Sequence, residues 1–206
     1  GGGVVATSFG PAPERTDGRL WVLDLSALWA GPLCGHLLGA GGAEVTKVES
    51  AARPDGARVG DRDLYDQLNA SKRRVLLDLQ SSRGRSDLKE LVGVFDVVIT
   101  ASRRRALDAL GLTPETWLER EGGPSVWVSI TGHGLASTRV AFGDDAAVAG
   151  GLVDSDDEGP TFLGDAVADP LSGLLAAARA AEAVATGHRI LRDVSMAGAA
   201  AAVGAA

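Results

Sequence analysis

The chain has little of the chemistry that metal-binding and disulfide-rich proteins need. Its 206 residues include one cysteine, Cys34, and three histidines. A disulfide framework requires paired cysteines, and cysteine-rich zinc or iron–sulfur sites require several, so the sequence excludes both classes. It also has no run of about 18 apolar residues, the length of a membrane-spanning helix. The sequence therefore predicts neither a metal site nor a membrane partner.

The N-terminal residues 1–18 lack the charged start and the apolar centre of a signal peptide. We expect this stretch to form a flexible extension. The whole chain is 45% hydrophobic and 23% charged, a composition typical of globular domains. Its length suits about one domain. Together these features predict a soluble, cytoplasmic protein.

Acidic residues outnumber basic ones and give a formal net charge of −7. This balance argues against a general nucleic-acid-binding protein, because the phosphate backbone favours a basic surface. Residues 47–105 differ, with 13 Lys and Arg against 9 Asp and Glu. A basic segment in an acidic chain suits a small polyanionic ligand, although ordinary solvated surface explains the same charges.

Short apolar segments alternate with helical patterns over residues 19–134. Strand-forming residues occupy 19–26, 43–49, 73–80, 95–100 and 124–134. Helical patterns lie between them, and Pro32 marks the first turn of the first helix. This alternation predicts an α/β fold, a Rossmann-like domain with a doubly wound parallel sheet.

Residues 135–206 have a different character. Glycines and an acidic run at 154–159 predict a loop and hairpin up to residue 162. From Asp169 the chain becomes alanine-rich, and we expect an α-helical hairpin there. The sequence thus divides into the extension 1–18, the Rossmann-like domain 19–134 and a C-terminal segment 135–206.

Two local motifs each have two interpretations. Residues 38–44, LGAGGAE, resemble the glycine fingerprint of dinucleotide-binding folds, but they end a helix instead of opening one. That position argues against a nicotinamide or flavin site. Asp169 precedes a proline, as an ordinary helix N-cap does. The same position keeps a carboxylate ionised and exposed, as a carboxylate nucleophile requires.

Eight segments follow one another in an order typical of a known family. They are VLDLSALWAGP (22–32), GAEVTKVE (42–49), SKRRVLLDL (71–79), DVVIT (96–100), LDALGL (107–112), SITGHG (129–134), GDAVADPLSGL (164–174) and DVSM (193–196). In this order the chain resembles the family III CoA-transferases, the group of formyl-CoA transferase, carnitine CoA-transferase and α-methylacyl-CoA racemase. Members of that family are longer, so we expect the C-terminal part of the family fold to be missing from this chain.

The resemblance implies an acyl-CoA:carboxylate CoA-transferase with an aspartate nucleophile. The family pattern A-D-x-x-[SA]-G-L falls on Asp169, and Asp165 is the alternative because the spacing back from DVSM favours it. In the implied chemistry the aspartate forms a mixed anhydride and then an aspartyl-CoA thioester, which divides one hard exchange into easier steps. The implied substrates are an acyl-CoA and a carboxylic acid acceptor, with no tightly bound cofactor.

Because the chain is short, the resemblance also leaves an alternative function. The chain would then be a catalytically impaired CoA-binding or assembly subunit, one half of a split transferase. In either case we expect a homodimer or a complex with a chain that supplies the missing half, since an incomplete core needs a partner to cover it.

The resemblance places CoA along the ends of the predicted strands. The implied CoA-binding residues are Trp29, Ala30, Leu77, Asp78, Leu79, Gln80, Ala101, Ser102, Arg103, Thr131, Gly132, His133 and Gly134. The basic segment adds Arg58, Lys72 and Arg73 as phosphate ligands, because lysine and arginine form charge-assisted hydrogen bonds with phosphate.

The chain departs from the family at several of these positions. Ser50 and Ala109 stand where formyl-CoA transferase-like members have arginine, and Thr131 stands where they have lysine. Trp29 stands where they have a smaller or polar residue. Phosphate binding must then be weaker or must involve the three arginines at 103–105.

The racemase branch of the family uses a histidine in a G-H-D motif as one of two bases. The matching residues here are Gly143, Asp144 and Asp145, so the histidine is absent. Proton exchange at the α-carbon needs a base on each face of the substrate. The sequence therefore disfavours racemase activity.

Overall fold

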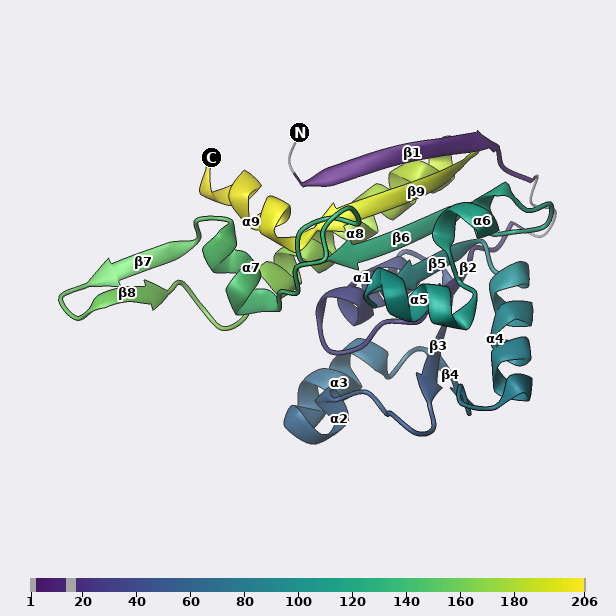
Figure 1. Ribbon diagram of the computed structural model, residues 1–206, viewed down its shortest axis with the longest axis horizontal. Coiled ribbons are helices and arrows are strands. Elements are labelled where there is room, and N and C mark those ends of the chain that lie inside the picture. The colour runs from purple at the N-terminus through teal and green to yellow at the C-terminus, as the bar shows by residue number, and fades with distance from the viewer. Residues whose placement is uncertain (1–2, 14–17, 206) are drawn as a thin grey trace.

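The computed structural model describes residues 3–13 and 18–205 and is drawn in Figure 1. Strands in the described residues are β1 (Val4–Pro11), β2 (Trp21–Asp24), β3 (Glu44–Ser50), β4 (Arg73–Leu77), β5 (Val97–Thr100), β6 (Val126–Thr131), β7 (Val153–Asp156), β8 (Gly159–Phe162) and β9 (His188–Ser195). The helices there are α1 (Ala30–Ala40), α2 (Ala57–Gly60), α3 (Arg62–Asn69), α4 (Ser82–Val94), α5 (Arg104–Leu110), α6 (Pro114–Glu119), α7 (Gly143–Ala149), α8 (Ala168–Ala185) and α9 (Met196–Gly204).

The main sheet confirms the predicted doubly wound α/β fold. Across the described residues its strand order is β1-β9-β6-β5-β2-β3-β4, and every neighbouring pair except β1–β9 is parallel. The chain builds outward from β2 in one direction through β3 and β4, and in the other through β5, β6 and β9. The strand order therefore reverses between β2 and β5, and in open α/β sheets ligands bind beyond the carboxyl ends of the strands at such a point.

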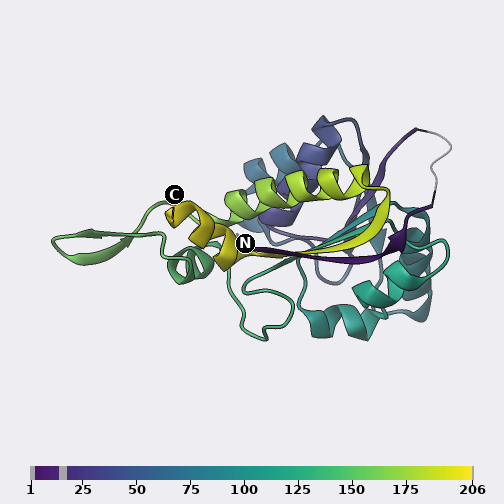
Figure 2. The same ribbon diagram turned by 90° about the horizontal axis from the view of Figure 1, so that it is seen from above.

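Helices cover both faces of the sheet, as Figure 2 shows from above. Successive residues of a strand point to opposite faces, so Val22 belongs to the apolar cluster under α1 and α8, whereas Leu23 belongs to the cluster under α4, α5 and α6. β6 follows the same rule, with Val128 on the first face and Trp127 on the second. Burial on both faces explains why these strands are apolar throughout.

Several helix ends follow from local sequence. The Ser81 hydroxyl accepts a hydrogen bond of 3.0 Å from the Gly84 N–H and so caps α4. Pro114 occupies the first turn of α6, where its missing N–H costs nothing. Gly111 ends α5 with a φ of +72°, a left-handed conformation that glycine adopts without steric cost.

The two strands at the β1 edge of the sheet differ from the expectations. Within the predicted extension 1–18, Val4–Pro11 forms β1 and pairs antiparallel with β9, while residues 1–2 and 14–17 lie outside the described residues. β9 itself inserts between β1 and β6. The division at residue 134 therefore does not separate two sheets, because a strand near the C-terminus completes the first one. Pairing between distant segments decides this, and local patterns do not record it.

The segment after β6 also differs in detail from the expected loop, hairpin and helical hairpin. Gly143–Ala149 forms α7, and β7 and β8 make the antiparallel hairpin that projects from the body in Figure 1. The alanine-rich stretch is one continuous helix of 18 residues, α8, and not a helical hairpin. Alanine favours a helix throughout and provides no signal for a turn. In the described part of the chain, no helix is long and apolar enough to cross a membrane.

Candidate functional site

The turn from β2 into α1 lies at the carboxyl edge of the sheet, beside the point where the strand order reverses. It runs from Leu25 to Trp29 and delivers the first residue of α1, Ala30. Helix α8 packs along α1, and no side chain at Gly173 separates them: a Cβ there would lie 2.7 Å from the Ala30 carbonyl oxygen. This close approach brings the amino-terminal ends of the two helices together.

Asp169 is the carboxylate at this junction. It lies in the first turn of α8, half-buried, and its Oδ1 accepts a hydrogen bond of 3.3 Å from the Ala30 N–H. The Gly143 N–H at the start of α7 donates a second hydrogen bond to the same carboxylate. Backbone groups from three helices therefore surround one carboxylate, because the first N–H groups of a helix have no partner within it.

The environment of Asp169 opposes its ionisation overall. Burial raises the pKa of the Asp169 carboxyl above its ordinary value, and the charges of Asp144 and Asp165 raise it further. The N–H groups of Ala30 and Gly143 act in the opposite direction, because they stabilise the charged form. A carboxylate with a raised pKa and directed donors is a candidate functional group.

The rival residue, Asp165, is exposed in the loop before α8. The residue after it, Ala166, has a φ of +47° and its N–H donates to Asp144 Oδ1 at 2.8 Å. Asp144 thus holds the loop that leads into α8. Of the two candidates, Asp169 is the one that the backbone donors of α1 and α7 contact.

The loops of the implied CoA site lie at the carboxyl ends of their strands. Trp29 and Ala30 follow β2, Leu77–Gln80 end and follow β4, and 101–103 follow β5. Arg103 is an exposed cation at the start of α5. The fold thus brings these segments to the same edge of the sheet as Asp169.

The loop after β6 completes this edge and is held by Asp193 of β9. Thr131 Oγ1 donates to Asp193 Oδ1 at 3.3 Å and accepts from the Gly134 N–H at 2.8 Å. The Leu135 N–H donates to Asp193 Oδ2 at 2.8 Å. Thr131, Gly132, His133 and Gly134 therefore have a defined path, although β9 was not expected to contribute to it.

Lys72 is not placed to bind phosphate. Its ammonium group is buried and lies 2.8 Å from Asp24 Oδ2, 2.7 Å from the Pro32 carbonyl oxygen and 2.9 Å from Asn69 Oδ1. These three acceptors use its three N–H donors. The lysine instead neutralises the buried Asp24 carboxylate, whose own pKa is lowered by Lys72 and Lys47 against the effect of burial.

Arg58 and Arg73 also have other partners. Arg58 forms two hydrogen bonds with Glu49, of 2.9 and 2.8 Å, and stacks on the Tyr65 ring at 4.3 Å. Arg73 is exposed, 3.5 Å from Glu44 and 5.6 Å from the Trp21 ring centre, at the amino-terminal ends of β3 and β2. The structure thus brings neither residue to the Asp169 edge, because burial and pairing could not be read from the local charge count.

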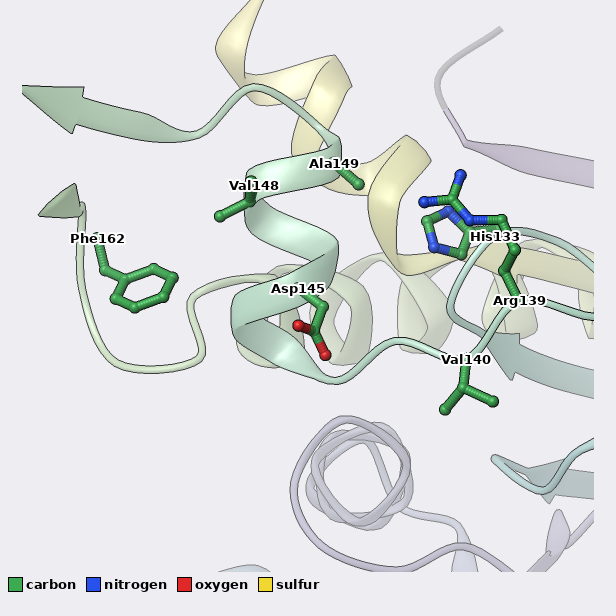
Figure 3. Close-up of a pocket in the computed structure, with 7 residues that line it drawn as sticks. All are labelled: His133, Arg139, Val140, Asp145, Val148, Ala149 and Phe162. Atoms are coloured by element: carbon green, nitrogen blue, oxygen red, sulfur yellow. The ribbon is translucent and has the colours of Figure 1, made fainter. Parts of the chain in front are cut away.

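His133 lines an open cavity of about 440 Å³ beside α7. Figure 3 shows this imidazole next to the Arg139 side chain, with Asp145 on α7 and Phe162 on the hairpin across the cavity. In the described residues, no group of three His, Cys, Asp or Glu side chains is placed to hold a metal ion.

Sequence reasoning missed Gly143 and Asp144 as parts of this site. Both were considered only as positions that lack a racemase histidine. A Cβ at Gly143 would overlap Asp169 Oδ2 and the Ala166 carbonyl oxygen, so this position requires glycine for the two elements to meet. The signal in the sequence is a glycine followed by two acidic residues, which has no meaning until α7 is placed against α8.

The chain is similar to known proteins over most of its length. A sequence profile of CoA-transferase family III matches residues 19–206. Succinyl-CoA–D-citramalate CoA-transferase of Chloroflexus aurantiacus is 30% identical over 178 residues, 80% of this chain and 44% of that protein. α-Methylacyl-CoA racemase of Homo sapiens is 34% identical over 117 residues, 57% of this chain and 28% of that protein.

A solved structure shares the fold. The CaiB/BaiF family protein from Brucella suis superposes with a TM-score of 0.81 at 28% identity, over 91% of this chain and 54% of that one. The chain therefore spans less than half the length of the two curated relatives and just over half of this solved chain.

Proposed function

This chain belongs to CoA-transferase family III, and we propose on that basis that it transfers CoA from an acyl-CoA to a carboxylic acid, with Asp169 as the nucleophile. The observation that carries the proposal is the carboxylate of Asp169, held by backbone N–H groups of two other helices at the carboxyl edge of the sheet. Covalent catalysis by a carboxylate needs such a positioned and activated group.

In the proposed reaction, a carboxylate oxygen of Asp169 attacks the thioester carbonyl carbon. The C–S bond breaks, CoA thiolate leaves, and a mixed anhydride joins Asp169 to the acyl group. The thiolate then attacks the aspartyl carbonyl, which releases the acyl group as a carboxylate and leaves an aspartyl-CoA thioester. The acceptor carboxylate takes the CoA through the same two steps in reverse, and the Asp169 carboxylate is regenerated.

The backbone donors have a defined role in these steps. When thiolate attacks the aspartyl carbonyl, negative charge develops on an oxygen of Asp169. The N–H groups of Ala30 and Gly143 already point at this carboxylate, and such preorganised donors stabilise an oxyanion where it forms. The two N–H groups thus orient the nucleophile before the reaction and bind its oxyanion during it.

CoA in this proposal lies along the loops after β2, β4, β5 and β6, and its phosphates meet exposed cations such as Arg103. Loops at this edge are where open α/β sheets bind ligands. Lys72 and Arg58 take no part, because their donors are engaged by Asp24 and Glu49.

The alternative is a CoA-binding or assembly subunit without transfer activity of its own. The observation in its favour is the shortage of cations at the edge: Ser50 and Thr131 stand where related transferases have basic residues, and Lys72 is engaged inside the fold. Such a subunit would act with a second copy or with a further polypeptide.

Intact-protein mass spectrometry after incubation with a panel of acyl-CoAs tests the proposal. We expect an adduct on the peptide that contains Asp169, and its loss after hydroxylamine, which cleaves thioesters and anhydrides. Asp169→Asn should abolish the adduct while the protein stays folded, and the matched variant Asp165→Asn should retain it. CoA binding without any adduct would contradict the transferase and support the binding subunit.

A further inference from the structure

The turn between β2 and α1 contains a residue in a costly backbone conformation. Leu28 has a φ of +69°, in the left-handed region that side chains with a Cβ rarely adopt. A non-glycine residue keeps such a conformation only when its surroundings hold it there. Leu28 itself is exposed, so packing of its side chain does not supply that restraint.

A buried ion pair holds the turn at two points. The Leu28 N–H donates to Asp55 Oδ1 at 3.0 Å, and the Ser26 carbonyl oxygen accepts from Lys47 Nζ at 2.8 Å. Lys47 Nζ and Asp55 Oδ2 are 3.0 Å apart, with side-chain exposures of 0% and 1%. One salt bridge, between β3 and the loop after it, thus fixes the backbone on both sides of residue 27.

The position of Asp55 is fixed in turn by its own neighbours. Its N–H donates to Glu49 Oε2 at 3.1 Å, and its Oδ1 also accepts from the Ala57 N–H at 3.0 Å. Neither Lys47 nor Asp55 contacts Asp169, and neither has a place in the reaction steps given above. An uncompensated charge at either residue would be expensive at this depth, so the pair acts as a unit.

Ala30 is two residues beyond Leu28, and the backbone angles of the turn decide where its N–H points. We propose that the buried Lys47–Asp55 pair is a positioning device for the nucleophile: Asp55 holds Leu28 in the left-handed conformation, and the Ala30 N–H consequently faces the Asp169 carboxylate. This inference rests on the proposed function for its catalytic meaning, but its structural content, the state of the Asp169 carboxylate, is measurable without any substrate.

The decisive comparison separates positioning from simple stabilisation of the fold. Lys47→Met with Asp55→Ala removes both charges together, so no unpaired charge stays buried. Adding Leu28→Gly to this double variant lets residue 28 adopt a positive φ without the Asp55 restraint, because glycine has no Cβ. A glycine in a turn cannot replace a lost core contact, so recovery by Leu28→Gly identifies a role in setting the turn.

We expect the double variant to form the Asp169 adduct at least tenfold more slowly than the wild type, and Leu28→Gly to recover several-fold of that loss. Val92→Ala, a buried truncation in α4 on the opposite face of the sheet, is the control for lost stability and should leave the rate unchanged. An unchanged rate in the double variant, or no recovery with Leu28→Gly, would overturn the inference.

Carbon-13 NMR titration of the Asp169 carboxyl gives a second readout in the free protein. Asp144 and Asp165 are the charged groups that raise the pKa of Asp169, and the variants leave both in place. Loss of the Ala30 donor should therefore raise the Asp169 pKa in the double variant, and Leu28→Gly should lower it again. If the wild type forms no adduct, the proposed transferase fails, while this titration still decides whether Lys47 and Asp55 position the donor.

Discussion

At the scale of single residues, the chemistry of Asp169 depends on what stands within a few ångströms of it. Burial and the acidic neighbours Asp144 and Asp165 raise its pKa, and two backbone N–H groups oppose them. Contact with the second donor requires that residue 143 have no side chain. The nucleophile is thus defined as much by a glycine as by the aspartate.

Substitution of that glycine gives a direct prediction. In Gly143→Ala the new Cβ would overlap Asp169 Oδ2 and the Ala166 carbonyl oxygen, so the carboxylate must move away from its donors. We expect at least a tenfold loss of adduct formation, measured by mass spectrometry against time. The control is Gly164→Ala, where a Cβ meets open space, and it should react like the wild type. Equal rates for both variants would contradict this geometry.

Glu49 predicts a pH dependence of stability. Burial raises its pKa, but hydrogen bonds from Arg58 and Tyr65 outweigh that effect and bring the pKa down to about 2. A carboxyl with a lowered folded pKa stabilises the protein above its unfolded pKa, about 4.3, and this contribution is lost as the pH falls towards 2. The shift corresponds to at most about 3 kcal/mol.

Urea unfolding of the wild type and of Glu49→Gln, between pH 6 and pH 2, measures this contribution. The wild type should be more stable by one to a few kcal/mol near pH 6, roughly the value of a buried charge-assisted network, and the difference should shrink as the pH falls. A difference that stays constant over this range would mean that the ionisation of Glu49 does not support the fold.

At the scale of elements, the contact between α1 and α8 decides where Asp169 lies. Small residues line it: α8 buries Gly173, Ala176, Ala177 and Ala180. Small side chains let the two backbones approach closely, so the first turn of α8 reaches the first turn of α1. Alanine content predicted a helix here correctly, but the continuity of α8 depends on this packing and is not recorded in local sequence.

Gly173→Ala tests the contact between these helices. The added Cβ would lie 2.7 Å from the Ala30 carbonyl oxygen and close to the side chain of Leu33. We expect a loss of about 1–3 kcal/mol in unfolding free energy, as for other overpacked sites, together with slower adduct formation. Gly60→Ala, which meets open space, should change stability by less than about 0.5 kcal/mol. Chemical denaturation of both variants provides the comparison.

At the scale of the whole molecule, segments far apart in sequence complete the sheet. β1 and β9 lie side by side at one edge, and β9 also pairs with β6 (Figure 1). β1 covers the backbone of β9, which would otherwise present unpaired N–H and C=O groups. Asp193 on β9 in turn holds the loop after β6, so this edge of the sheet is linked to the candidate site.

Deletion of residues 1–11 should uncover that edge. We expect a lower melting temperature and concentration-dependent self-association, because an exposed strand edge is a template for pairing with another chain. Analytical ultracentrifugation and thermal unfolding measure the two effects. A truncated protein with the sedimentation and melting temperature of the full chain would show that β1 contributes nothing to the sheet.

The sequence by itself determined the α/β class, the central strands and the motif that contains Asp169, because each depends on residues adjacent in the chain. Apolar runs bounded by glycine and proline mark buried strands wherever they occur. Ordered motifs indicated the family for the same reason. These features are local, and local chemistry is what a sequence records.

The tertiary structure alone decided which charges are free and which groups meet. Lys72 and Arg58 read as phosphate ligands in the sequence, yet the fold buries one against Asp24 and pairs the other with Glu49. The donors of Ala30 and Gly143 come from elements more than a hundred residues apart. A buried charge must be paired, and its partner is chosen by packing between elements, which no local pattern contains.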